Sequence, residues 1–140
     1  MADPTTATSQ MQAVAVSALK AQQARMRVIA ENIANADSTA TTANGTPPYR
    51  RQIPVFQTSK IDGASGVKMA QVMQDNSPFN REYDPGHPAA DANGYVLKPN
   101  VEPLTETIDM KEAQRAYEAN LNVIDTAKAM DTSTLGILTK

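Results

Sequence analysis

The sequence contains no cysteine, no tryptophan and a single histidine, at position 87. Without cysteine the chain forms no disulfide and offers neither a thiolate nucleophile nor a cysteine metal ligand. A zinc site usually requires at least three suitable ligands, which one histidine does not supply. Phosphate-binding loops, dinucleotide fingerprints and serine nucleophile elbows are also missing from the sequence. We therefore expect a protein that is not an enzyme and binds no metal and no cofactor.

Large apolar side chains are scarce as well. Leu, Ile, Val and Phe together account for 24 of the 140 residues, whereas alanine alone accounts for 22. Such a low fraction indicates disorder when net charge is high, but the net charge here is only −2. Alanine-rich helices approach one another closely yet bury little apolar surface within one chain. The composition therefore predicts a chain that becomes fully ordered only by packing against partners.

Neither a membrane nor a nucleic acid is indicated as a partner. No apolar run approaches the roughly 18 residues expected of a membrane span. The first ten residues, MADPTTATSQ, lack the basic and apolar regions of a cleaved secretory signal. The sequence pI of about 5.3 argues against binding to nucleic acid.

The first forty residues carry a heptad-like pattern that begins near Ser9. Steps of four and three residues place these positions on one face of a helix: Ala15, Leu19, Gln22, Met26, Ile29, Ile33 and Ala36. We expect this helix to end between Asn32 and Asp37, before a run of turn-forming residues. An ordinary amphipathic helix on a globular core has a similar face, so a coiled coil requires a second matching helix.

That second helix is predicted at 104–138, which contains neither proline nor glycine before Gly136. Its length of roughly 50 Å exceeds the diameter of a compact globule of this size, on the order of 35 Å. One of its faces again follows steps of three and four: Met110, Ala113, Tyr117, Asn120, Ile124 and Ala127. Residues 7–36 carry a charge of +2 (three bases, one acid) and residues 104–140 carry −2 (four bases, six acids), which favours pairing.

The centre of the chain is rich in proline and glycine. Short strands are predicted at 49–57 and 67–74, with Pro54 restricting the first to a sheet edge or a bulge. Residues 61–66 read as a flexible loop because they contain two glycines. Residues 75–103 read as a packed loop with one strand at 95–97.

Two glycines in this centre have specific expected roles. Asn44-Gly45 is the strongest turn dipeptide in the chain. Gly94 is expected at a positive φ or at a close approach of two backbone segments. The predicted fold is mainly α with a small β-rich central module, and its expected domains are a helix at 1–36, the module at 37–103 and a helix at 104–140.

Three segments resemble, together and in this order, bacterial flagellar basal-body rod proteins, most closely those of the proximal rod: AENIANADS, DPGHPAADANGYVLKPNVEP and RAYEANLNVIDTAKAM. The resemblance implies export through the flagellar type III apparatus without a cleaved signal, and helical assembly in the periplasm. It implies that the terminal helices are disordered in the monomer and pair as a coiled coil on assembly. It further implies a drive shaft that transmits motor torque to the hook.

The implied partners are copies of the chain itself, other rod proteins, the MS ring and the export gate at the rod base. The positions expected to contribute to subunit contacts combine the helix faces with the three segments: Leu19, Met26, Ile29, Asn32, Ile33, Asn35, Asp84, Pro85, Asp91, Gly94, Tyr95, Pro99, Asn100, Arg115, Tyr117, Asn120, Ile124 and Met130. For the asparagines, plain helix capping by Asn35 and solvent exposure of Asn32 and Asn120 remain open alternatives.

Two other classes of protein fit part of the pattern. An enzyme centred on His87, between Asp84 and Asp91, would lack a second histidine or any cysteine. A secreted coiled-coil axial or adhesin-type protein would share the two helices but would not need the central proline-rich segment. The rod interpretation is the one that uses all three segments.

Overall fold

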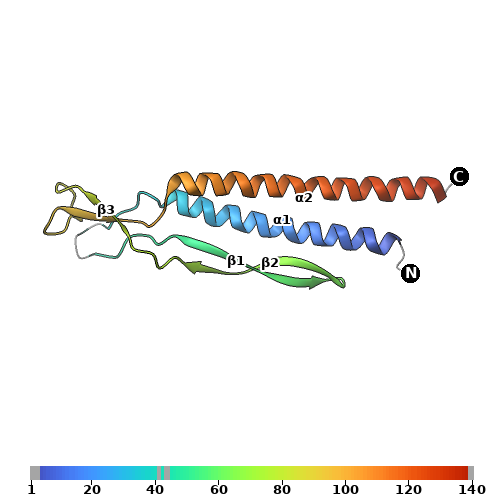
Figure 1. Ribbon diagram of the computed structural model, residues 1–140, viewed down its shortest axis with the longest axis horizontal. Helices are drawn as coiled ribbons and strands as arrows, with labels where there is room; N and C mark the ends of the chain where they lie inside the picture. The colour runs from blue at the N-terminus through green and yellow to red at the C-terminus, as the bar shows by residue number, and fades with distance from the viewer. Residues whose placement is uncertain (1–3, 41, 43–44, 139–140) are drawn as a thin grey trace. The chain divides into compact units, whose positions relative to one another are not determined.

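The computed structural model describes residues 4–40, 42 and 45–138 and contains two long helices and two small sheets (Figure 1). Helix α1 spans Pro4–Ala34 and helix α2 spans Pro103–Leu138. The strands are β1 Gln52–Ile61, β2 Ala64–Gln74, β3 Asn80–Tyr83 and β4 Tyr95–Lys98. The helices contain 31 and 36 residues, about half of the chain, which confirms the expected mainly α fold with a small β-rich centre.

Both helices begin at a proline, which is favoured at the first helical position because its missing N–H would have no intrahelical partner there. Helix α1 starts five residues before the predicted Ser9, and α2 starts one residue before Leu104. At the end of α1, the Asn35 side-chain Nδ2 donates to the carbonyl of Glu31 at 2.8 Å. Asn35 therefore caps the helix, in agreement with one of the two roles considered for it.

Strands β1 and β2 form a hairpin closed by a two-residue turn, Asp62 and Gly63. Both turn residues have positive φ, 48° and 83°, as a type I′ turn requires. The predicted loop at 61–66 is therefore wrong, because the Asp-Gly pair lets both strands continue to the turn. The strand predicted at 49–57 instead spans Gln52–Ile61. Both strands of a two-stranded sheet are edge strands, so Pro54 lies on an edge strand as expected.

The chain divides into two compact units. Unit 1 contains residues 1–26, 55–71 and 111–140, and unit 2 contains residues 27–54 and 72–110.

Within unit 1, α1 and α2 run antiparallel. Gln12 donates a hydrogen bond to Asp131 at 3.3 Å, and Arg25 forms an ion pair with Glu112 at 3.7 Å. Between the two helices the buried residues are small.

Ala113 and Ala127 of α2 are completely buried, and Ala15 of α1 is nearly so. Ala15, Ala113 and Ala127 belong to the helix faces predicted from the sequence. Small side chains at these positions allow the helix backbones to approach closely, but each buries little area.

Unit 2 contains a short antiparallel sheet in which β3 pairs with β4 from Asn80 opposite Lys98 to Tyr83 opposite Tyr95. Strand β4 confirms the predicted strand at 95–97. Strand β3 was not predicted, because all four of its residues are exposed and show no apolar alternation.

Gly94 closes the connection between these two strands at a φ of 79°. A Cβ at this position would lie 2.9 Å from the Tyr83 ring and 3.1 Å from the Cβ of Pro85. The expected positive φ of Gly94 is confirmed, and the two atoms closest to a Cβ here belong to side chains, not to a second backbone segment. The turn Asn44-Gly45 lies partly outside the described residues, but the Gly45 N–H donates to the carbonyl of Thr42 at 2.9 Å.

We predict that Gly94→Ala destabilises unit 2 by at least about 1–2 kcal/mol, because a Cβ is strained at positive φ and also clashes. Gly86→Ala is the matched control in the same loop, since its nearest neighbour would be the Asp84 Oδ1 atom at 3.6 Å and its φ is ordinary. Urea unfolding of both variants measures the difference. Equal losses of unfolding free energy would show that the Gly94 backbone is not constrained.

Candidate assembly interface

Asn32, near the end of α1, is 1% exposed and uses its full hydrogen-bonding capacity. Its Nδ2 donates to the carbonyl of Gln52 at 2.8 Å and to Oε2 of Glu106 at 3.0 Å. Its Oδ1 accepts from the Gln52 N–H and from the Tyr49 hydroxyl, both at 2.9 Å. An amide offers two N–H donors and two acceptor lone pairs, and all four are occupied here. Asn32 therefore ties α1 to the start of β1 and to the first turn of α2.

Glu106, in the first turn of α2, is also 1% exposed. Its Oε1 accepts a hydrogen bond of 2.5 Å from Nε of Arg51. The same guanidinium lies 3.8 Å from Asp75 and 3.7 Å from Asp109. A carboxylate is favoured near a helix N-terminus by the helix dipole. The charge on Glu106 is thus compensated by an ion pair, an amide and a helix end, as burial of a charge requires.

Asn100 connects this cluster to the segment that follows β2. Its Oδ1 accepts from the Arg51 N–H at 2.8 Å, and its Nδ2 donates to the Asp75 carbonyl at 3.0 Å. The Asp75 N–H donates in turn to the Arg51 carbonyl at 2.8 Å. We call the connected set of Asn32, Tyr49, Arg51, Gln52, Asp75, Asn100 and Glu106 the polar junction.

Two groups of the polar junction have shifted pKa values. Hydrogen bonds from the backbone and side chain of Ser77 lower the pKa of Asp75 below its ordinary value of 3.8, and Arg51 adds to the effect. Burial raises the pKa of Tyr49, assisted by the negative charges of Glu31 and Glu106. The neutral Tyr49 hydroxyl is therefore retained as a donor to Asn32.

The proline-rich central segment forms a separate network in unit 2. Oδ1 of Asp91 accepts from the N–H groups of Asn93 and Tyr95 at 2.8 and 3.0 Å, and the Tyr95 bond is the main cause of its lowered pKa. Oδ2 of Asp91 pairs with Arg81 at 3.1 Å, and the Arg81 guanidinium lies over the Tyr95 ring. These contacts position an exposed aromatic side chain.

His87 links its own loop to the segment that follows α1. Its Nδ1 accepts from the Ala89 N–H at 3.0 Å, and its Nε2 lies 3.3 Å from Oγ1 of Thr39. Among residues 4–40, 42 and 45–138 no three His, Cys, Asp or Glu side chains are grouped to hold a metal ion. The geometry is that of a histidine that stabilises a loop.

The polar junction includes two of the sequence-predicted positions, Asn32 and Asn100, but the others lie elsewhere. Ile29 and Pro99 are buried, and Leu19, Met26, Asn35, Gly94, Tyr117, Asn120 and Ile124 are half-buried. The exposed positions are Ile33, Asp84, Pro85, Asp91, Tyr95, Arg115 and Met130.

Asn120 is distant in sequence from the junction and belongs to unit 1. Its Nδ2 donates to the carbonyl of Ala116, four residues earlier in α2, at 2.8 Å. With Met11, Val14 and Val123 it lines an apolar pocket between the helices of that unit. Its amide therefore serves its own helix, and its exposure is only partial.

Sequence reasoning did not identify Arg51, Glu106 and Tyr49. A possible signal was the Arg50-Arg51 pair at the start of a strand, followed later by a carboxylate in the first turn of a helix. Nothing in the sequence alone shows that these charges meet, because they are 55 residues apart.

Comparison with known proteins identifies the class. A family model described as "Flagella basal body rod protein" matches residues 13–40, and one described as "Flagellar basal body rod FlgEFG protein C-terminal" matches residues 92–137. These segments contain the end of α1, strand β4 and the start of α2. The chain belongs to the flagellar basal-body rod protein family, and it is a structural protein of the flagellum, the organelle of motility.

Within that family the chain is similar to proteins named flagellar basal-body rod protein FlgC. The relative from Agrobacterium fabrum (strain C58) is 46% identical over 139 residues, which is 97% of this chain and 96% of the relative. That from Salmonella typhimurium (strain LT2) is 44% identical over 87% of this chain and 91% of its own length. The relative from Bacillus subtilis (strain 168) is 41% identical over 84% of this chain and 89% of its own length. The resemblance inferred from the three segments is confirmed.

We predict that Asn32→Ala lowers the unfolding free energy by about 2–4 kcal/mol, because it leaves buried partners unpaired, among them the Glu106 carboxylate. Asn35→Ala is the control, since it removes one partly exposed bond within the helix and should cost about 0.5–1 kcal/mol. Urea unfolding measures both. Comparable effects of the two substitutions would mean that the junction contributes no more than an ordinary helix cap.

A second prediction concerns acid. Because the pKa of Asp75 is lower in the folded than in the unfolded chain, ionisation of Asp75 stabilises the folded state at pH values above 3.8. That contribution is lost as the pH falls below 3.8 towards the folded pKa. The stability difference between the wild-type chain and Asp75→Asn should be largest near neutral pH and shrink on acidification. A difference that does not change with pH would contradict the assignment.

Proposed function

We propose that this chain is a structural subunit of the proximal rod, which polymerises in the periplasm and transmits motor torque to the hook. Its partners are copies of itself and other rod proteins, with the MS ring and export gate at the rod base. Delivery through the flagellar type III export apparatus follows from the same assignment. Membership of the rod family supports this proposal.

One structural observation carries the assembly part of the proposal. Large apolar side chains along α2 remain more than half exposed in the single chain: Leu104, Ile108, Met130, Leu135 and Ile137. Neither helix has a stretch apolar enough to cross a membrane within the described residues, so these side chains do not form a bilayer-spanning surface. A rod built from parallel copies would bury them against neighbours.

We infer further that the terminal helices pair as a coiled coil and are ordered by assembly. Fixing the backbone costs about 1–2 kcal/mol per residue, whereas the contact between α1 and α2 in unit 1 is formed largely by alanine. Intersubunit burial then supplies the missing stabilisation. The division into a helix at 1–36, a central module at 37–103 and a helix at 104–140 belongs to this proposal.

The chain is not proposed to be an enzyme, since its family is structural and both ring nitrogens of His87 contact groups of the fold, at Ala89 and Thr39. An adhesin-type coiled-coil protein is the alternative considered from the sequence. The family matches at both ends of the chain favour the rod over that alternative.

Circular dichroism of the purified monomer, with amide exchange, tests the ordering of the helices. We expect far fewer helical residues than the 31 and 36 that α1 and α2 contain in the structure. Exchange should be fast in unit 1 and slow around the polar junction in unit 2. Fully helical, cooperatively melting termini would contradict folding on assembly. Absence of the chain from the rod in electron cryomicroscopy of basal bodies would contradict the function itself.

A further inference from the structure

Gln22 of α1 carries a buried carbonyl oxygen that has no hydrogen-bond donor. Its Oε1 atom is almost inaccessible to solvent, and no donor in the part of the chain that the structure describes is hydrogen-bonded to it. The residue as a whole is half-buried. Buried polar side-chain atoms in native proteins are nearly always paired, so an unpaired one needs a physical explanation.

The position of Gln22 places it on the side of α1 that faces α2. It lies seven residues after Ala15, and residues seven apart in a helix point in nearly the same direction. Ala15 is buried and lines a pocket of unit 1 together with Asn120 and Val123 of α2. The hydrogen bond and the ion pair that join α1 to α2 lie on either side of Gln22 along the helix. Gln22 therefore belongs to the contact between the two helices in unit 1.

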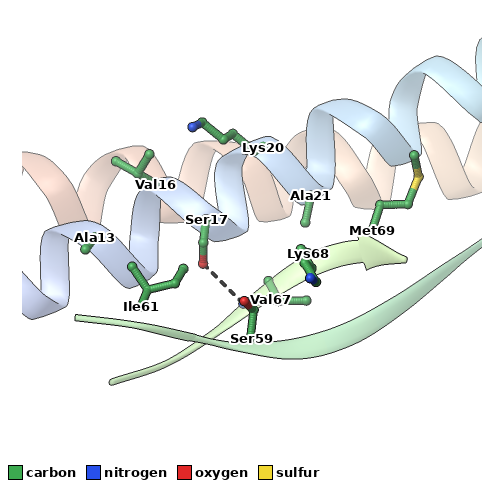
Figure 2. A pocket seen from close by; sticks show the side chains of 10 residues that line it. All are labelled: Ala13, Val16, Ser17, Lys20, Ala21, Ser59, Ile61, Val67, Lys68 and Met69. Atoms are coloured by element: carbon green, nitrogen blue, oxygen red, sulfur yellow. Dashed lines mark hydrogen bonds between the residues drawn. The ribbon is translucent and has the colours of Figure 1, made fainter. Parts of the chain in front are cut away.

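The side of α1 that faces the β1–β2 hairpin is different (Figure 2). There the buried polar residue is Ser17, whose side chain points from the helix toward the hairpin. Its Oγ donates to the carbonyl of Val14 at 2.7 Å and accepts from the Val67 N–H at 3.2 Å. The hydroxyl is thus used both as a donor and as an acceptor. The contact of α1 with the hairpin does not carry the cost that Gln22 imposes on the contact with α2.

Asn32, ten residues later in the same helix, is a buried amide whose hydrogen-bonding positions are all filled within unit 2. It stabilises the fold around it. The Oε1 atom of Gln22, in contrast, loses its bond to water on burial and gains none in return. A polar residue in a coiled-coil seam can fix the register of the helices, but that role requires a partner for the amide.

The cost is large compared with the other contributions to this contact. A buried polar group left unpaired lowers the equilibrium constant for ordering by roughly ten- to hundredfold. The opposing apolar contribution is small, because the fully buried residues of α2 in unit 1 are the alanines Ala113 and Ala127. Met130 and Ile137, which would contribute more, remain 54% and 77% exposed.

We propose that Gln22 keeps the contact between α1 and α2 weak in a single chain, so that unit 1 opens readily before the chain enters the rod. This inference rests on the proposed function, since only a subunit that orders on assembly has a use for such a contact. It identifies one side chain as the cause. Neighbouring subunits that cover the exposed apolar residues of α2 offset the cost of the unpaired carbonyl, because they bind only the ordered state.

Gln22→Met tests this inference, because methionine resembles glutamine in length and helix propensity but has no amide that needs partners. Gln23→Met is the matched control, since Gln23 is the adjacent residue of the same type and is exposed. The helical signal of each purified chain is followed by circular dichroism in trimethylamine N-oxide, which favours the ordered state, and in urea, which opposes it.

We expect Gln22→Met to raise the equilibrium constant for ordering by roughly tenfold or more. Gln23→Met should change it by no more than about twofold, as is usual for a surface position. Gln22→Leu makes the same kind of change if Gln22→Met aggregates. An equilibrium constant that is unchanged or lower in the Gln22 variants would overturn the inference, and so would an equal gain in Gln23→Met.

Amide hydrogen exchange locates the effect within the chain. In Gln22→Met, exchange should become slower in the parts of α1 and α2 that belong to unit 1 and should stay the same around Asn32 in unit 2. Slower exchange around Asn32 alone would contradict an effect on the contact between the helices.

Incorporation into the rod provides the test in cells. Each variant replaces the wild-type chain, and its amount in isolated basal bodies is measured together with motility. We expect less incorporation and lower motility for Gln22→Met than for Gln23→Met. Equal incorporation of a variant whose contact is stronger in the purified chain would overturn the role of Gln22 before assembly. Absence of the wild-type chain from basal bodies would instead contradict the proposed function, and the effect of Gln22 on the purified chain is measured independently of that result.

Discussion

The rest of unit 2 depends on the buried contact between Asn32, Glu106 and Arg51. Each of these side chains comes from a different part of the chain, and the Glu106 carboxylate takes one partner from each of the other two. A buried carboxylate without its arginine, or without its amide, would cost several kcal/mol. The contact therefore makes the end of α1, the start of β1 and the start of α2 cooperative.

Unit 1 is stabilised in a different way. Its helices meet through alanines that are fully buried, such as Ala113 and Ala127, while Met130 and Ile137 on the same helix remain exposed. The close approach of α1 and α2 buries only a small part of the apolar surface of α2. The apolar surface of α2 that stays exposed is available for contacts with neighbouring subunits. A chain with a modest core of its own is therefore well suited to a polymer.

The long helices and their inward faces were predictable because heptad spacing is a local property of the sequence. Gly94 was predictable because few other residues fit a tight turn. The hairpin turn at Asp62-Gly63 does not follow from the sequence pattern, because two glycines within four residues indicate a flexible loop as readily as a type I′ turn. Strand β3 was missed because exposed polar residues give no alternation.

The sequence by itself determined the class of protein, the two helices and the scarcity of core-forming side chains. These follow from composition, from spacing within a few turns and from three recognisable segments. Only the tertiary structure decided that Asn32 is buried and saturated, that Asn120 serves its own helix, and that Arg51 meets Glu106. The physical reason is that hydrogen bonds between residues tens of positions apart depend on how the chain folds back, which no local pattern encodes.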